Sequence, residues 1–410
     1  MKSLTRPSGR SIRTPQGYTA FVPDPLPPKL AWTPVLTRAL SDADRLIGQL
    51  AGEGGQLPNP HVLIRPFVRR EAVLSSRIEG TRATLGELLA AEAGAPVERS
   101  PDDLREVANY VKALEQGVAR LKTLPLSLRL LRELHAALMG GVRGQHATPG
   151  EFRRSQNWIG PPGCTLANAS YVPPPAEDMT ACLGAWEHFL HDRSLPPLAQ
   201  AALLHYQFEA IHPFLDGNGR IGRLLITLFF VEREILPSPL LYLSAFFEAA
   251  RRDYYERLQG VTEHGDWEGW LQYFLNGVAR QSEDALGRAA RINQLLAAWR
   301  EKATTETSSK VPVKLVDVLA RNPYLTLTGA ARQLKVAFTT VQRAAERLEK
   351  LGIVKEVSGR QRNRVYCATA LLSILEAPAQ LSPGIRGQGI RGHLTNSSGE
   401  PSVEARGENE

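Results

Sequence analysis

The 410-residue chain is poor in cysteine: it has three, and they stand far apart at Cys164, Cys182 and Cys367. An odd and unclustered set excludes a disulfide scaffold and a zinc site built from cysteine, and it is typical of a reducing compartment. Long apolar runs are missing as well, and a stretch such as 228–231 is far too short to cross a membrane. Residues 1–17 lack the apolar segment of a secretory signal. We therefore expect a cytoplasmic protein without a membrane partner.

Acidic residues are scarce in one part of the chain, residues 311–370. That segment holds eleven lysines and arginines against four acids, a net charge of 11 − 4 = +7. The whole chain also carries +7, so the remainder is neutral on balance. A nucleic-acid partner, if the protein has one, therefore belongs to this segment. The composition of the whole chain, 43% hydrophobic and 22% charged, is that of a globular protein.

Apolar residues recur at helical spacing through most of the chain, so the sequence predicts a mostly α fold. Residues 1–30 are expected to form an extended arm, and 140–175, with six glycines and six prolines, an irregular region with a short strand pair. A polar stretch at 304–310 marks a domain boundary, and the tail from 377 to 410 lacks the apolar surface to fold. The predicted helices cover 35–50, 63–89 with a break near Gly80, 101–121, 126–139, 177–192, 196–210, 220–233, 250–260, 266–279 and 283–303.

Residues 212–223, His-Pro-Phe-Leu-Asp-Gly-Asn-Gly-Arg-Ile-Gly-Arg, concentrate side chains that can do chemistry. The glycines at 217, 219 and 222 also fit the spacing of a dinucleotide fingerprint, but that motif has to follow a β-strand. Residues 198–211 have helical spacing instead, so we exclude a dinucleotide-binding fold. The glycines let backbone N–H groups approach an anion at the point where a helix begins.

The side chains of this loop suit the transfer of a phosphate group. Arg220 and Arg223, three apart on a helix, share a face and can both bind phosphate oxygens. Asp216 offers the oxygen ligand that Mg²⁺ takes together with substrate phosphates. His212, with an ordinary pKa of about 6.5, can accept a proton near neutral pH. The alternative is a tight turn between helices with an ion pair at the surface.

The whole loop resembles the signature HPFx(D/E)GNGRxxR of the Fic family, helical enzymes that mostly transfer AMP from Mg·ATP to a protein hydroxyl. Two further elements are similar to that family. Residues 156–160 with 171–175 resemble its flap, a strand pair that docks the backbone of the target. Residues 253–255, Asp-Tyr-Tyr, resemble its tyrosine element beside the nucleotide. Together these features cover roughly residues 60–280, more than half the chain.

The resemblance implies a role for each matching residue. His212 is the base that deprotonates the target hydroxyl, and Asp216 holds Mg²⁺. Arg220 and Arg223 bind the outer phosphates, while Phe214 is a buried anchor. For Phe214 and Tyr255 plain packing in the core is the competing interpretation. The implied nucleotide-binding residues are His212, Gly217, Asn218, Gly219, Arg220, Ile221, Gly222, Arg223 and Tyr255.

A second motif at residues 75–80, Ser-Ser-Arg-Ile-Glu-Gly, matches the family's inhibitory pattern (S/T)xxxE(G/N). The resemblance implies that Ser75 and Glu79 are inhibitory, with the carboxylate of Glu79 on the arginines in place of the γ-phosphate. The alternative is a surface glutamate that ends a helix before Gly80. Two other candidates are weaker, since His188 and His191 fit solvated helix residues better than metal ligands and Cys164 has no partner histidine nearby.

The basic segment resembles a winged helix-turn-helix. Residues 326–335 and 338–351 are predicted helices, and Phe338, Val341, Ala345, Leu348 and Leu351 form the expected apolar face of the second. Residues 353–354 and 365–366 are expected to pair across a basic tip at 359–364. A recognition helix in the major groove and a wing on the backbone would bind duplex DNA. The same fold also serves for docking proteins, and that alternative stays open.

The sequence thus predicts a mostly α, helical Fic core with a short β-hairpin flap and a small C-terminal winged-helix domain. Its function would be that of a protein adenylyltransferase, autoinhibited by Glu79, which modifies a target protein and itself. The alternatives are a DNA-binding regulator with a sensory Fic core, and a Fic enzyme that uses another nucleotide or removes AMP. Expected partners are ATP with Mg²⁺, a target with a Ser, Thr or Tyr hydroxyl, DNA, and a second copy of the chain. The predicted domains are an arm and inhibitory region (1–98), the Fic core (99–303), a linker (304–310), the winged helix (311–376) and a disordered tail (377–410).

Overall fold

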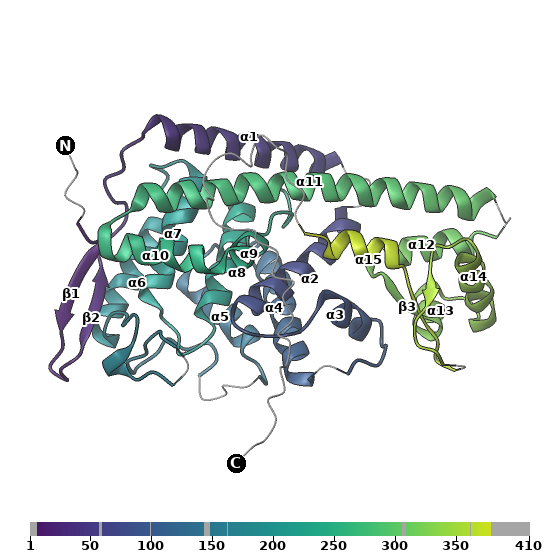
Figure 1. Cartoon of the computed structure of the whole chain (residues 1–410), viewed down its shortest axis with the longest axis horizontal. Coiled ribbons are helices and arrows are strands. Elements are labelled where there is room, and N and C mark those ends of the chain that lie inside the picture. The colour runs from purple at the N-terminus through teal and green to yellow at the C-terminus, as the bar shows by residue number, and fades with distance from the viewer. Residues whose placement is uncertain are drawn as a thin grey trace, which may run out of the picture.

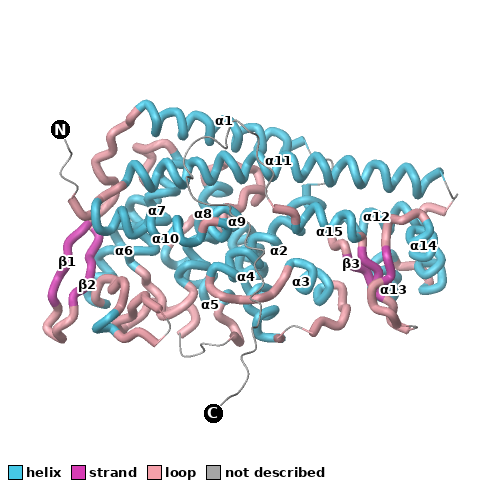
Figure 2. The backbone as a smooth tube through the Cα atoms, in the orientation of Figure 1, coloured by secondary structure: helices cyan, strands magenta, loops and turns pink. Residues whose placement is uncertain are grey.

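Helices make up most of the chain, as the apolar spacing predicts (Figure 2). The structure, a computed structural model, describes residues 6–56, 60–98, 100–142, 148–161, 163–305, 309–360 and 362–378. The tail predicted to be disordered lies outside the described residues from 379 onward. Within the described residues, none of the helices combines the length and the apolar character that a membrane crossing requires.

Two adjoining helices form the centre of the molecule, α7 (Pro197–Ile211) and α8 (Asn218–Glu232). Nearly every residue of both is buried, because apolar side chains lie on every side of each helix, and the polar residues among them, such as Arg220 and Arg223, are buried as well. Helices of the first half of the chain pack around them (Figure 1). These are α2 (Pro60–Ile78), α4 (Pro101–Arg120), α5 (Leu128–Leu138) and α6 (Ala176–Leu190).

The longest element, α11 (Trp267–Thr305), is one helix of 39 residues where the sequence predicts two. No glycine or proline interrupts residues 280–282, and Gln281 and Ser282 are buried, so the helix continues through the expected gap. Helix α1 (Pro34–Gln56) lies along it (Figure 1) and runs beyond residue 50, where the sequence places its end. At Gly54 a Cβ would lie 2.3 Å from Leu240 Cδ1, so the Leu240 side chain packs closely on that glycine.

The N-terminal residues form a hairpin, not the extended arm that the sequence predicts. Strand β1 (Gly9–Arg13) pairs antiparallel with β2 (Thr19–Pro23) across a turn in which Gly17 has φ +89°. Both strands are short, and neither alternates between buried and exposed residues, which hides them in the sequence. Four consecutive residues of β2, including Phe21, are buried, and the Phe21 N–H donates to the carbonyl of Val172 at 2.9 Å.

Two further helices, which precede α11 in the chain, pack against it. Helix α9 (Ser244–Ala249), which the sequence analysis missed, is followed at once by α10 (Arg251–His264), which was expected at 250–260. Helix α9 packs against α2 and α11. It therefore brings Ser244 next to the helix that carries the predicted inhibitory motif.

The basic C-terminal segment combines four helices with a three-stranded antiparallel sheet of order β3-β5-β4. The two predicted helices are confirmed, whereas the side chain of Phe338, expected on the apolar face, is 47% exposed because burial in that helix begins only at Val341. In chain order the elements are α12 (Val311–Arg321), β3 (Tyr324–Thr326), α13 (Leu327–Leu334), α14 (Phe338–Lys350), β4 (Lys355–Glu356), β5 (Val365–Cys367) and α15 (Thr369–Glu376).

Candidate active site

The His212 loop connects the two central helices. Helix α7 ends at Ile211, and His212 follows in the left-handed conformation with φ 49°, which is uncommon for a residue other than glycine. Gly217, with φ +78°, precedes the first turn of α8. A helix, not a strand, comes before the glycines, so the dinucleotide-binding fold is excluded as predicted. The loop presents the first backbone N–H groups of α8, which a helix leaves without intrahelical partners.

Asn218 and Phe214 fix the shape of this loop. The Asn218 side chain accepts from the Phe214 N–H and donates to the Phe214 carbonyl, both at 2.8 Å. The ring of Phe214 is fully buried and stacks on His135 at a centroid distance of 3.8 Å. Nε2 of His135 bonds to the Asp216 carbonyl at 3.0 Å. Because the side-chain oxygen and nitrogen of Asn218 both bond to Phe214, an anion can be bound by the backbone N–H of Asn218 rather than by its side chain.

Two residues of the flap region hold the loop from outside, and the sequence analysis missed both. Arg153 is buried and forms no ion pair with a carboxylate among the described residues. It donates to the carbonyls of His212 at 3.0 Å and Pro174 at 2.5 Å. Asn157 donates to the carbonyls of His212 and Phe214 at 3.2 and 2.8 Å. No spacing in the sequence connects residues 153–157 with the loop. Their hydrogen bonds tie the flap to the position of His212.

His212 is neutral and has a free ring nitrogen. Its Nδ1 lies 3.3 Å from the carbonyl of Glu209. A carbonyl can only accept, so Nδ1 carries the proton and Nε2 keeps a lone pair. Burial lowers the pKa of His212 to about 4, with the bond to Glu209 opposing the shift. The imidazole is therefore ready to accept a proton at neutral pH.

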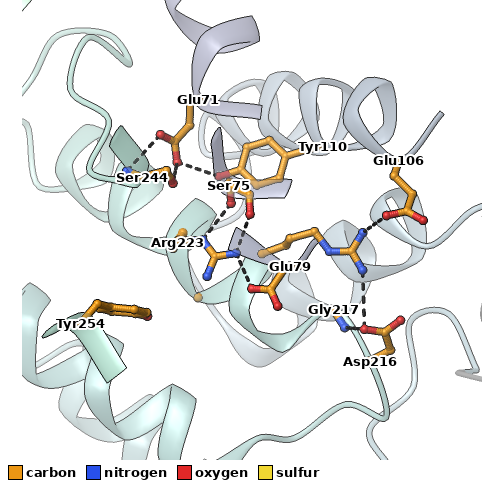
Figure 3. A network of polar contacts seen from close by, with 12 residues as sticks. Glu71, Ser75, Glu79, Glu106, Tyr110, Asp216, Gly217, Arg223, Ser244 and Tyr254 are labelled. Carbon is orange, nitrogen blue, oxygen red and sulfur yellow. Dashed lines mark hydrogen bonds and ion pairs between the residues drawn. The ribbon is translucent and has the colours of Figure 1, made fainter. Parts of the chain in front are cut away.

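The two arginines of the signature meet different carboxylates (Figure 3). Arg223 donates to Glu79 at 2.6 Å and to the hydroxyl and carbonyl of Ser75 at 2.9 Å each. Arg220 lies 3.3 Å from Glu106 of α4 and 3.6 Å from Asp216. Both guanidinium groups are buried. The partnership with Glu106 has no signal in the sequence, since that residue comes from a separate amphipathic helix.

Glu79 occupies the space above the first turn of α8. A Cβ on Gly219 would lie 2.3 Å from the Glu79 carboxylate and 2.9 Å from the Arg223 guanidinium. Burial acts to raise the pKa of Glu79, but the charge of Arg223, its hydrogen bond and the charge of Arg220 hold this pKa below its usual range. Glu79 is thus ionised and bonded to Arg223, although it directly follows the end of α2 and 33% of its side-chain surface is exposed.

A buried polar cluster lies behind this pair, around Glu71 (Figure 3). Its carboxylate accepts from the Ser244 hydroxyl, from the Ser244 N–H at 3.3 Å and from the Tyr110 hydroxyl at 3.2 Å. Burial raises the pKa of Glu71. Glu71, Ser75 and Glu79 recur every four residues along α2 and its end, so this polar stripe was the signal available in the sequence.

Glu209, in the last turn of α7, is a second unexpected acid. Its Oε1 is buried and has no hydrogen-bond partner in the described part of the chain. A Cβ on Gly222 would lie 2.4 Å from this oxygen, so that glycine makes the room the carboxyl needs. Burial raises the pKa of Glu209 to about 7, although the charge of Arg223 opposes the shift.

Asp216 is exposed at the edge of the loop, where its carboxylate accepts from the Gly217 N–H at 2.5 Å. No group of three or more potential metal ligands occurs among the residues with described positions. One carboxylate suits an ion such as Mg²⁺, which takes its other ligands from phosphates and water. His188 and His191 are exposed, as expected of solvated helix residues.

Two elements beside the loop, the helix that carries Tyr255 and the flap, have exposed aromatic or apolar side chains. Tyr255, with 42% of its surface exposed, lies 5.1 Å from the buried ring of Tyr254, so it is not a core residue. The flap is an antiparallel bridge between Ile159 and Tyr171, with hydrogen bonds of 2.8 and 3.0 Å, at the place where the sequence predicts the strand pair. The side chains of Trp158 and Ile159 beside it are 41% and 38% exposed.

The sequence matches two models of one family. Residues 37–119 match the Fic/DOC family N-terminal model and residues 125–230 the Fic/DOC family model. The protein adenylyltransferases Fic of Drosophila virilis and Drosophila grimshawi are 35% identical to it over 158 residues, 36% of this chain and 30% of each relative. The alignment thus spans under a third of their length.

The fold has a counterpart among solved structures. The crystal structure of a Fic family protein from Desulfovibrio desulfuricans superposes with a TM-score of 0.56 at 20% identity, over 84% of this chain and 98% of that one. The helical core with its His212 loop is therefore a Fic domain preceded by the N-terminal region of that family. Residues 37–119 and 125–230 thus match the two models of the Fic/DOC family.

Proposed function

We propose that this chain is a protein adenylyltransferase that Glu79 holds in an inhibited state. The observation that carries the proposal is the 2.6 Å contact between Glu79 and Arg223, at the loop whose residues fit a triphosphate. The names of the curated relatives support the transfer of AMP. Cytoplasmic location and association of two copies stay predictions from the sequence.

The residues of the loop fit each part of the transfer. The target hydroxyl attacks the α-phosphorus of ATP while its proton passes to Nε2 of His212, and the bond to the bridging oxygen breaks to release pyrophosphate. The N–H groups at the start of α8 hold the phosphates. Asp216 would hold Mg²⁺ together with these phosphates, and the ion would supply charge neutralisation.

Inhibition follows from competition for one arginine. Arg223 binds either a carboxylate or a γ-phosphate fully, because its donors are already directed at Glu79 and Ser75. With Glu79 in place, the γ-phosphate cannot bind Arg223 and the α-phosphate lies out of line with the attacking hydroxyl. A misplacement of about 1 Å costs roughly a hundredfold in rate.

The test is transfer of label from ATP or UTP, each marked at the α-phosphate, to protein in the presence of Mg²⁺. Glu79→Gly should raise self-modification at least about tenfold, a barrier change of about 1.4 kcal/mol. Arg223→Ala should be slow and should gain nothing from Glu79→Gly. Glu53→Gly, which removes an exposed helical glutamate, is the matched control and should behave like wild type.

Other outcomes distinguish the alternatives. Label from UTP alone would assign a different nucleotide. Loss of AMP from a modified protein that requires Glu79 would indicate removal of AMP. If Glu79→Gly transfers no label from either nucleotide, the proposal of an inhibited transferase is wrong and a sensory Fic core is favoured.

We also propose that residues 311–376 form a winged helix that binds duplex DNA. The supporting observation is the net charge of +7 in residues 311–370 together with the exposure of Arg343 on α14 and of Arg360 and Arg362 beyond β4. Arginines in these places would bind phosphates of the backbone. The exposed side chains of Phe338 and Val357, 47% and 46%, suit the rival interpretation, a protein-docking surface.

A further inference from the structure

The short helix α3 (Leu85–Glu92), which follows Glu79 and a turn, is held at both ends by the C-terminal segment. At its start, the Gly86 N–H donates to the Glu376 carboxylate at 3.1 Å. At its end, the Asn322 side-chain amide donates to the Leu89 carbonyl at 2.8 Å and the Thr326 hydroxyl to the Ala93 carbonyl at 3.2 Å. Helix ends are where backbone groups lack intrahelical partners, so these bonds fix the position of α3.

The same segment also packs on the helix before Glu79. Helices α12 and α15 both contact α2, and strand β3 contacts α3. Arg288 of α11 holds the end of α15 through the carbonyls of Leu375 at 3.3 Å and Ala377 at 3.0 Å. The turn that carries Glu79 thus lies between two helices that both contact the C-terminal segment.

This interface has an apolar part and a polar part, and it is incompletely filled. Buried residues of α3, α12 and α15, among them Leu88, Leu315 and Leu371, belong to the same hydrophobic core. An open pocket of about 380 Å³ lies on one side of α3, lined by Glu92, Asn322 and Thr326 among others. A second pocket of about 360 Å³ lies near the start of α3, lined by Thr84, Leu85 and Glu376 among others. These pockets leave room beside the hydrogen bonds at the two ends of α3, so the bonds can lengthen without a clash.

We propose that docking of residues 311–376 on α3 holds Glu79 against Arg223. Asn322, Thr326 and Glu376 are then positioning residues, which act on the nucleotide site through Glu79. Undocking would free α3 and the preceding turn, and Arg223 would become available to a γ-phosphate. The inference rests on the proposed function and deepens it, because it assigns the control of inhibition to the C-terminal segment.

The test uses the full chain with the double variant Asn322→Asp/Glu376→Ala. Aspartate keeps the oxygen that accepts from the Tyr324 N–H, 2.8 Å away in the native protein, but faces the Leu89 carbonyl with another acceptor. Asn293→Asp/Glu301→Ala makes the same changes on exposed positions of α11 and is the matched control. Circular dichroism checks that each variant is folded.

Two readouts are compared in the wild-type and Glu79→Gly backgrounds. The first is transfer of label from ATP, which the interface variant should raise roughly tenfold over its control, as expected for the loss of two hydrogen bonds. The second is the ratio of ATP to ADP affinity, measured by calorimetry without turnover. This ratio should rise when Arg223 becomes free for the γ-phosphate. Neither readout should change further when Glu79 is already glycine.

Each result decides a separate question. An unchanged affinity ratio in the interface variant overturns the inference, and so does an equal rise in both backgrounds, because the effect would then bypass Glu79. A ratio that rises in the interface variant and in Glu79→Gly, without label transfer by any variant, supports the coupling and refutes the proposed transferase activity. Hydrogen exchange at residues 79–93 should become faster in the interface variant only.

Discussion

At the scale of single residues, His212 has a left-handed backbone conformation and a ring that is protonated on Nδ1. We expect His212→Ala to reduce transfer by roughly 10²–10⁴-fold, the usual contribution of a general base, while ATP still binds. His191→Ala, an exposed histidine, is the control. Label transfer and calorimetry with ATP measure the two effects. Near-normal transfer by the variant would remove His212 from the mechanism.

The pKa of His212, about 4, also fixes the dependence of transfer on pH. The imidazole accepts a proton from the target only while it is itself neutral. Transfer should therefore stay level from pH 8 down to about 5 and fall as the pH approaches 4. A profile that drops around pH 6.5 would contradict the lowered pKa. Such a drop would show that nucleotide binding restores an ordinary value.

Glu209 offers a test through stability. Burial raises its pKa in the folded protein to about 7, above the usual 4.5, so folding is unhindered below pH 4.5 and loses stability as the pH rises through 7. Glu209→Gln removes this loss. We expect it to raise the melting temperature at pH 8 and to change little at pH 5. Glu53→Gln, at an exposed site, should have no effect at either pH.

At the scale of elements, α14 and the residues beyond β4 decide whether the basic segment binds DNA. Full-length protein should bind duplex DNA with an affinity that falls steeply with salt. Arg343→Ala/Arg360→Ala/Arg362→Ala should flatten the logarithmic salt slope by about 0.9 for each phosphate that the protein no longer neutralises. Arg129→Ala/Arg154→Ala removes two exposed arginines elsewhere and should leave the slope unchanged. Without binding at low salt, the protein-docking interpretation with Phe338 and Val357 replaces it.

The difference between predicted and observed elements has physical causes. The His212 loop could be predicted because its groups are contiguous, and the contact of Glu79 with Arg223 because a motif marks the glutamate. Arg153 and Glu106 could not, since they reach the loop from separate elements and no periodicity relates them to it. The hairpin β1–β2 was missed because its strands have only five residues each and neither alternates between buried and exposed positions.

At the scale of the whole molecule, a buried ion pair on α11 joins the core to the C-terminal segment. Arg288 lies 2.9 Å from Asp284, and both are nearly inaccessible. Arg288→Met should destabilise the protein by about 3–5 kcal/mol, because Asp284 would keep a buried charge without its main partner. Arg288→Met/Asp284→Leu should recover much of this loss. Urea denaturation measures both, and a double variant no more stable than the single one would contradict the argument.

The position of the Glu79 carboxylate, close above Gly219, limits how this protein can evolve. A side chain at position 219 would expel the carboxylate, but it would fill the same space that the phosphates of the proposed substrate need. A lineage therefore cannot escape restraint by altering the first turn of α8 without losing the substrate as well. Heritable routes to a permanently active form pass instead through Glu79, the turn that carries it, or the segment docked on α3, where changes leave His212 and Asp216 in place.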